Sequence, residues 1–219
     1  MARRYPQLSL PLRPWGGARR NGGRKPAGPR PGVPHAPRVS PAARYPAHVT
    51  VRMMGHVYNL RSRRCFRIVE RALRRGCDRF GFRAVQFAAL GNHLHLIVEA
   101  EDAVALGRGM KGLGVRLARG LNRVMERKGR VLADRYHSRL LRTPREVRNA
   151  LVYVLNNANK HFRVRYGIDP FSSAPWFGGW REAVGRSADP PPVVAARTWL
   201  LEVGWLRHGR IGIAEVARE

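Results

Sequence analysis

The sequence predicts an α+β protein whose core is a ferredoxin-like antiparallel sheet. Between residues 48 and 141, strand-like and helix-like hydrophobic patterns follow one another in the order strand, helix, strand, strand, helix, strand. This is the order of a ferredoxin-like β-α-β-β-α-β unit. A further amphipathic helix follows directly. A chain of 219 residues, of which 44% are hydrophobic, has room for one such domain and its extensions.

The first strand and the first helix are expected over residues 48–54 and 61–80. In the strand, alternating apolar side chains share one face: Val49, Val51 and Met53. In the helix, apolar side chains recur at helical spacing and form one stripe: Cys65, Val69, Ala72, Leu73 and Phe80. Gly81 is the expected end of this helix.

Residues 83–89 predict the second strand, and a short turn at Gly91-Asn92 leads into the third. A second helix is expected over 102–126 and a last strand over 131–141. The second helix contains a G-x-G-x-x-G spacing, which also occurs in dinucleotide-binding proteins. That fingerprint needs a tight turn that opens a new helix in a parallel unit. Here the apolar stripe runs through the glycines, so we attribute them to close helix packing.

The third strand carries the first candidate site. Because side chains alternate along a strand, His93 and His95 share one face. The aliphatic side chains between them and after them point to the core: Leu94, Leu96 and Val98. Two neutral imidazoles on one face of a strand can reach a single divalent ion. An edge strand with two solvated histidines is the alternative.

A helix that begins at Thr143 and continues to His161 carries the second candidate site. Thr143 and Glu146 form a capping box at its start. Its buried stripe is expected to comprise Val147, Ala150, Leu151, Val154, Leu155 and Ala158. At about 100° per residue, Tyr153 and Asn157 fall on roughly the opposite side, one turn apart. Both can therefore serve a site on a neighbouring surface.

The net charge of +28 comes mostly from arginine and indicates a polyanionic partner, of which nucleic acid is the commonest kind. Residues 1–46 are rich in Arg, Pro and Gly and predict a disordered basic arm. The sequence contains no apolar run long enough for a membrane span and no secretory signal. Its two cysteines are expected to be reduced thiols. We expect a cytoplasmic protein that does not bind membranes.

These motifs together resemble the single-tyrosine HUH transposases. The segment from Gly91 to Val98 resembles that family's P-N-H-V-H-L-L-V block. The pair Arg135-Tyr136 and the later Y-V-L-N-N from Tyr153 to Asn157 are similar to the REP-associated tyrosine transposases in particular. The resemblance spans residues 48–161. It implies the HUH endonuclease type of ferredoxin-like sheet, with an added C-terminal catalytic helix.

The resemblance also implies an activity: a metal-dependent endonuclease and strand transferase that acts on single-stranded DNA. His93, His95 and Asn157 would hold Mg²⁺ or Mn²⁺. Tyr153 would attack the scissile phosphate, form a 5′-phosphotyrosine and release a 3′ hydroxyl. Relatives recognise folded single strands, so hairpin-forming repeats are the expected partner. The protein would act as a monomer or a homodimer.

Four basic side chains are predicted to contact DNA: Lys111, Arg135, Arg139 and Lys160. For Arg135 and Arg139, a solvated basic strand is an equally good interpretation. Tyr136 is the alternative nucleophile. Two other functions stay open, namely a nucleic-acid-binding protein without chemistry on the same fold and a metal-dependent RNase.

The expected organisation has three parts. Residues 1–46 form the basic arm, residues 47–165 form the HUH transposase-like catalytic domain, and residues 166–219 form an accessory C-terminal segment. Aromatic residues and a Pro190-Pro191-Pro192 linker characterise the last part, and a short helix is expected over residues 198–207.

Overall fold

A computed structural model describes residues 42–162 and 167–216. In chain order its helices and strands are β1 (Ala47–Arg52), α1 (Arg63–Arg74), β2 (Asp78–Arg79), β3 (Phe82–Ala89), β4 (His93–Ala100), α2 (Ala103–Val124), β5 (His137–Leu140), α3 (Pro144–Phe162), η1 (Ala174–Trp176), α4 (Trp199–Glu202) and η2 (Gly204–His208). The predicted basic arm lies outside the described residues except for 42–46. The predicted boundary between residues 165 and 166 also lies outside them.

The five strands form one antiparallel sheet in the order β2-β3-β4-β1-β5. If the two-residue β2 is set aside, the remaining strands have the order and directions of a ferredoxin-like sheet. The predicted fold class is therefore confirmed. Strand β1 lies between β4 and β5, so alternate residues of these three strands face the same side of the sheet.

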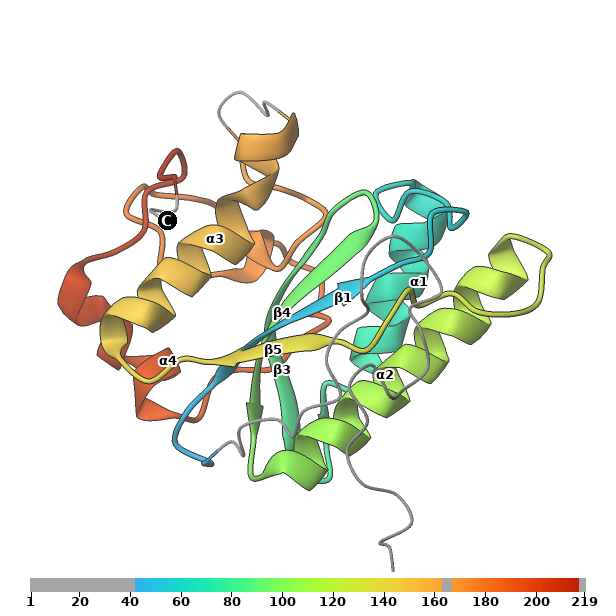
Figure 1. The fold of residues 1–219 in the computed structure, drawn as a ribbon. Coiled ribbons are helices and arrows are strands. Elements are labelled where there is room, and N and C mark those ends of the chain that lie inside the picture. Colours follow the sequence, from blue (N-terminus) through green and yellow to red (C-terminus); the bar gives the residue numbers. More distant parts are fainter. Residues whose placement is uncertain (1–41, 163–166, 217–219) are drawn as a thin grey trace, which may run out of the picture. The chain divides into compact units, whose positions relative to one another are not determined.

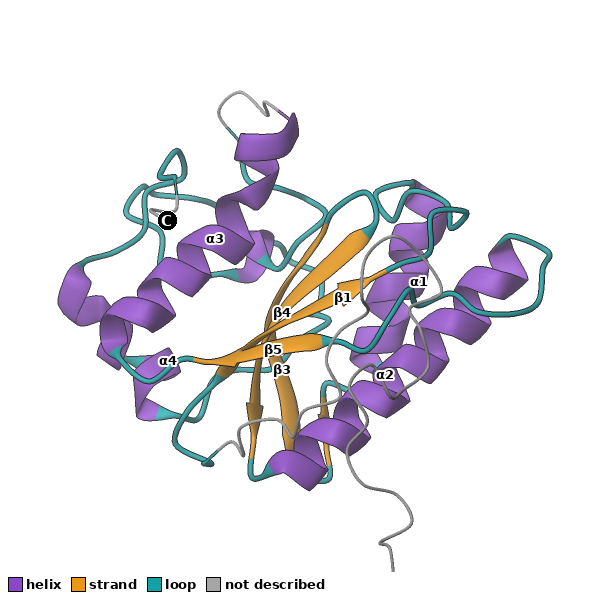
Figure 2. Ribbon diagram, viewed as in Figure 1, coloured by secondary structure: helices purple, strands orange, loops and turns teal. Residues whose placement is uncertain are grey.

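Helices α1 and α2 cover one face of the sheet, and α3 lies on the other face (Figures 1 and 2). The α1 and α2 side holds the larger core, to which the strands contribute their aliphatic alternates: Val49, Val51, Leu94, Leu96 and Val98. The α3 side holds a second core with Val85, Ala88 and Ile97 from the sheet. That second core covers only part of its face, which leaves the histidines of β4 next to α3.

The first helix is shorter than predicted. It ends at Arg74, and Phe80, which was expected in its buried stripe, is 76% exposed. Phe80 and Gly81 have φ angles of 53° and 73° and connect β2 to β3. Two successive residues with positive φ are typical of a tight hairpin turn, which no helix contains. The prediction of a helix up to Phe80 was wrong because the hairpin was overlooked.

The last strand of the sheet is also shorter than the predicted 131–141. Near its start the chain pairs with the end of β1, through Met54 N–H to Val131 O (2.8 Å) and Ala133 N–H to Arg52 O (2.9 Å). The carboxylate of Asp134 then accepts the backbone N–H of Arg135 at 2.7 Å. This local bond competes with strand pairing, so regular pairing begins only at His137.

The packing role expected of the glycines in α2 is confirmed for one of them, Gly109. A Cβ atom at Gly109 would collide with the ring of Phe82, so the absence of a side chain lets α2 approach β3. Asp102 accepts the N–H of Ala105 at 2.7 Å and caps the helix start. No helix among the described residues is long and apolar enough to cross a membrane.

Helix α3 begins with the predicted capping box. Glu146 N–H donates to Thr143 Oγ1, and Thr143 N–H donates to the Glu146 carboxylate, both at 3.2 Å. Every residue of the predicted stripe is buried: Val147, Ala150, Leu151, Val154, Leu155 and Ala158. Val152 is buried as well, because residues 167–216 pack on α3 from its other side. This segment belongs to the same compact unit as the sheet.

Candidate active site

The candidate site begins with the two histidines of β4. Their register partners on β1 are Arg52, opposite His93, and Thr50, opposite His95. The two imidazole rings lie nearly parallel, with centroids 6.3 Å apart and an interplanar angle of 12°. The alternation predicted from the sequence is confirmed, because both rings lie on the face that α3 partly covers while Leu94 lies in the core below.

The ring of His95 is held by two side chains of β1. Its Nδ1 atom lies 3.2 Å from Thr50 Oγ1 and 3.3 Å from His48 Nε2. The rings of His48 and His95 are also stacked, with centroids 5.4 Å apart. A metal-binding histidine commonly has its second ring nitrogen fixed in this way, which sets the tautomer and the direction of the first.

His48 and Thr50 were not among the predicted site residues. The sequence could have indicated them, because both residues alternate with Val49 and Val51, which are buried. A ferredoxin-like order also places β1 beside β4, which carries His93 and His95. Burial, followed by the nearby charges of His137 and Arg139, lowers the pKa of His48 to about 4. His48 is therefore neutral at pH 7 and adds no positive charge that would repel a cation.

Tyr153 reaches this group of histidines from α3. Its ring meets that of His95 edge-on at a centroid distance of 5.2 Å and that of His48 at 5.5 Å. The side chain is only partly buried. The structure thus brings together Tyr153 and the β4 histidines, which are 58 residues apart along the chain when counted from His95.

Asn157 follows Tyr153 by one turn of α3. Helix α3 runs with its C-terminal end toward the end of the sheet where β4 begins (Figure 1). Four helical residues rise by about 6 Å, and two strand residues span about 6.6 Å. Asn157 is therefore displaced from Tyr153 in the same direction as His93 is displaced from His95.

The amide of Asn157 is the one feature of the site that the fold itself does not account for. Asn157 is 3% exposed, yet neither its Oδ1 nor its Nδ2 has a hydrogen-bond partner among the described residues. An unsatisfied buried amide costs about 1–3 kcal/mol, so such groups call for an explanation. An amide oxygen is a good ligand for Mg²⁺ or Mn²⁺. The donor set of two imidazoles and one amide fits a divalent ion.

Within the described residues, no group of three His, Cys, Asp or Glu side chains could hold a metal ion by itself. From the described residues, an ion at His93 and His95 would therefore draw on a different kind of ligand, such as the amide of Asn157.

The three predicted DNA-binding residues whose side chains are described do not lie together. Arg139 lies on the site face of the sheet, opposite His48, and forms an ion pair with Glu146 (Nη2 to Oε1, 3.0 Å). Lys111 and Arg135 line a separate groove of about 810 Å³ between α2 and residues 129–136. The side chain of Lys160 lies outside the described residues. DNA contact by these four residues stays a prediction.

Tyr136, the alternative nucleophile, lies away from the histidines. It lines the same groove as Lys111 and packs against the core on the α1 and α2 side. His137 begins β5. As the register partner of Thr50, it faces the same side of the sheet as the site histidines, whereas Tyr136 faces the other side. The geometry therefore favours Tyr153 over Tyr136 as the residue that acts with His93 and His95.

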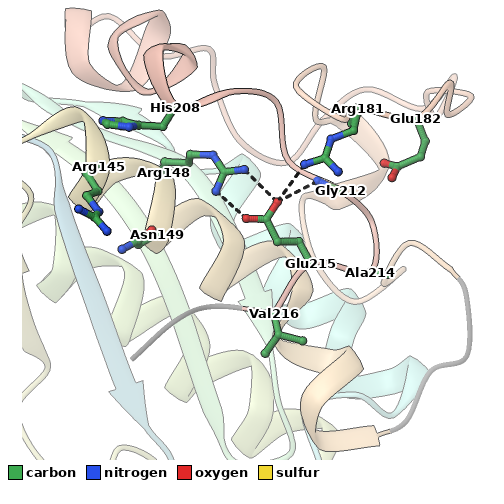
Figure 3. A pocket seen from close by; sticks show the side chains of 10 residues that line it. All are labelled: Arg145, Arg148, Asn149, Arg181, Glu182, His208, Gly212, Ala214, Glu215 and Val216. Carbon is green, nitrogen blue, oxygen red and sulfur yellow. Dashed lines mark hydrogen bonds and ion pairs between the residues drawn. The ribbon is translucent and has the colours of Figure 1, made fainter.

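The C-terminal segment is fastened to the helix that carries Tyr153. Arg148 binds Glu215 with both terminal nitrogens, at 2.5 and 2.9 Å (Figure 3). It also donates to the carbonyls of Gly209 and Arg210. Asn156 donates to the carbonyls of Gly212 and Glu215, at 2.9 and 2.8 Å. These contacts border a cleft of about 1040 Å³. They hold α3 from the side opposite the sheet.

We expect Glu215→Gln to lower the free energy of unfolding at pH 7 by about 1–2 kcal/mol, since it weakens a charge-assisted bidentate contact. The bond from Arg148 holds the pKa of Glu215 below its usual value of 4.5. Stabilisation by a carboxylate with a lowered pKa is present above the unfolded-state pKa and is lost as the pH falls through the folded-state pKa.

Urea unfolding of wild type and variant between pH 7 and pH 3 checks this expectation. The difference should shrink toward acid, and the exposed Glu126→Gln should serve as a near-neutral control at every pH. A difference that does not change with pH would show that the ionised carboxylate is not the stabilising group.

Neither a protein-family model nor a curated protein sequence matches the chain. Among solved structures, the chain is similar to a REP-associated tyrosine transposase bound to a REP hairpin. The TM-score is 0.52 at 14% sequence identity, and the match covers 64% of this chain and 82% of the transposase. At this identity the likeness shows a shared fold. The sheet of this chain is thus of the type found in that transposase.

Proposed function

We propose that this protein is a metal-dependent endonuclease and strand transferase that acts on single-stranded DNA through Tyr153. The observation that carries the proposal is the contact of Tyr153 with the ring of His95, one turn before a buried amide that has no hydrogen-bond partner in the described part of the chain. A protein that only bound nucleic acid would need neither feature. The solved transposase of the same fold binds a hairpin, which supports a DNA substrate.

The proposed reaction is a transesterification at phosphorus. The phenolic oxygen of Tyr153 forms a bond to phosphorus while the bond from phosphorus to the 3′ oxygen breaks. The proton of the phenol passes to solvent, and the 3′ oxygen takes up a proton and leaves as a hydroxyl. The 5′ phosphate stays on the tyrosine. Attack by a 3′ hydroxyl in the reverse direction rejoins a strand without a nucleotide cofactor.

His93, His95 and Asn157 would hold Mg²⁺ or Mn²⁺. When bound, the ion would neutralise charge on the phosphate oxygens and favour the phenolate of a tyrosine whose pKa is ordinarily about 10. With the His95 proton on Nδ1, next to Thr50 and His48, the Nε2 atom would be the nitrogen open to the ion. The neutral His48 fixes this ring without adding charge to the site.

The substrate is expected to be single-stranded beside a hairpin. The partly buried ring of Tyr153 lies between the sheet and α3, so a phosphate must enter a space that is bounded on two sides. A duplex resists the bending that such an entry requires, whereas a single strand does not. RNA cleavage by the same residues is the alternative outcome, which an RNA strand of the same sequence distinguishes.

A cleavage assay with 5′-labelled and 3′-labelled strands tests the proposal. We expect a protein-linked 5′ end with hairpin-bearing single-stranded DNA and Mn²⁺, and much less product with a perfect duplex of the same sequence. Equal cleavage of the relaxed duplex would contradict the single-stranded substrate. Cleavage without any protein-linked product would favour hydrolysis over transfer.

A further inference from the structure

A second basic surface lies on the other side of the sheet from Tyr153. Helices α1 and α2 border a groove of about 290 Å³ that is lined by five arginines: Arg71, Arg75, Arg116, Arg119 and Arg123. Arg71 of α1 and Arg75, the residue that caps the end of α1, are four apart. The three residues from α2 are three and four apart, so each set forms one row along its helix. The remaining lining residues are Ile68, Ala72 and Gly120.

The rows are held at a close helix contact. A Cβ atom at Gly120 would collide with Ile68, so the helices approach to a distance that only glycine permits. Arg116 is fixed in the groove, because its Nε donates to the carbonyl of Ala72 at 2.9 Å and its guanidinium occupies the space that Gly76 leaves. The other four arginines of the groove are exposed.

The groove has no internal source of negative charge. None of its described lining residues is acidic, and none of the five guanidinium groups forms an ion pair among the described residues. Burial, followed by the charge of Arg79, lowers the pKa of Arg116. Cations that line one groove are stabilised by an anion with charges spaced along its length.

We propose that this groove binds the phosphate backbone of double-stranded DNA, namely the paired stem beside the single strand that Tyr153 cleaves. The groove is too small for a whole duplex, so it would hold one backbone strand with a row of arginines on either side. Successive arginines within a row are about 4.5–6 Å apart along the helix axis. Each row can thus contact successive phosphates of one strand.

The lining favours a paired stem over an unpaired strand. Surfaces that bind single strands combine positive charge with aromatic side chains on which bases stack. No described residue that lines this groove is aromatic. Contacts from arginine to phosphate position a duplex without reading its bases. The choice of DNA rests on the proposed function, whereas affinity for a duplex backbone can be measured without any cleavage.

The test compares two variants that each lose four positive charges. The groove variant is R71Q/R75Q/R119Q/R123Q, which spares Arg116 because that side chain supports the helix contact. The matched control is R63Q/R64Q/R67Q/R108Q, whose exposed arginines lie on the same two helices outside the groove. Binding is measured in EDTA over a range of salt concentrations, with hairpin DNA and with an unpaired strand of equal length. The double variant R71Q/R123Q provides the same comparison if the quadruple variant unfolds.

We expect the groove variant to lose at least tenfold more hairpin affinity than the control at moderate salt. The slope of the logarithm of its binding constant against the logarithm of the salt concentration should be shallower than that of wild type by up to about 3.6, for four lost phosphate contacts. Its affinity for the unpaired strand should match that of the control. Equal losses in the two variants would overturn the groove as a site. Equal losses with hairpin and unpaired strand would overturn the paired stem as its ligand. If wild type formed no covalent DNA adduct, the proposed function would fail. The binding comparison would still show whether the groove binds a paired stem, because it is made without cleavage.

Discussion

Tyr153→Phe is expected to abolish the covalent protein–DNA product and to lower strand cleavage by roughly 10³-fold or more, because it removes the attacking oxygen. The variant keeps the ring that packs edge-on against His95 and His48. It should therefore fold as the wild type does and bind hairpin DNA with similar affinity. Labelled single-stranded DNA on a denaturing gel measures the product, and thermal unfolding measures the fold.

Tyr136→Phe is the matched control, since it removes the same atom from a tyrosine on the other side of the sheet. We expect this variant to form the covalent product at a rate close to that of wild type. If Tyr136→Phe lost the product and Tyr153→Phe retained it, the roles assigned to the two tyrosines would be reversed.

Asn157→Leu is expected to separate stability from metal binding. The variant replaces a buried amide, for which residues 42–162 and 167–216 provide no described hydrogen-bond partner, by an apolar side chain of similar size. Without metal, it should raise the free energy of unfolding by about 1–2 kcal/mol, since the cost of the unsatisfied amide disappears. Cleavage should be lost in the same variant, because the ion would lose the oxygen ligand proposed for it.

Unfolding midpoints with EDTA and with Mn²⁺ check both parts of this expectation. Mn²⁺ should raise the midpoint of wild type, because a ligand that binds the folded state stabilises it. It should raise the midpoints of Asn157→Leu and His95→Ala much less. The exposed Asn149→Ala, one turn before Tyr153, should behave as wild type in both conditions. A metal-free Asn157→Leu that is less stable than wild type would show that the amide serves the fold rather than an ion.

The predictions that depended on a single element were the most successful. Strand alternation was enough to place His93 and His95 on one face, and helical spacing with a capping box was enough to define α3 and its buried stripe. These patterns are local, because they follow from the geometry of one strand or one helix. The fold class followed from their order along the chain.

The features that required knowledge of neighbouring elements were missed. His48 and Thr50 enter the site only because β1 pairs with β4 in one register. Lys111 and Arg135 were grouped with Arg139 by charge, yet the sheet separates them from the Tyr153 side. Charge along a sequence does not specify a face of the fold. The arginine groove forms where two helices meet, so it could not be predicted from the sequence pattern of either helix alone.

The most direct measurement is the identification of the residue that carries DNA after cleavage. Wild type is incubated with hairpin-bearing single-stranded DNA and Mn²⁺, the DNA is trimmed to a nucleotide, and the protein is digested with trypsin. Cleavage after Arg148 and Lys160 yields a peptide whose one tyrosine is Tyr153, whereas cleavage after Arg135 and Arg139 yields one with Tyr136. Mass spectrometry should find a 5′-linked nucleotide on the peptide with Tyr153. A nucleotide on the peptide with Tyr136, or on neither peptide although the strand is cut, would contradict the central claim.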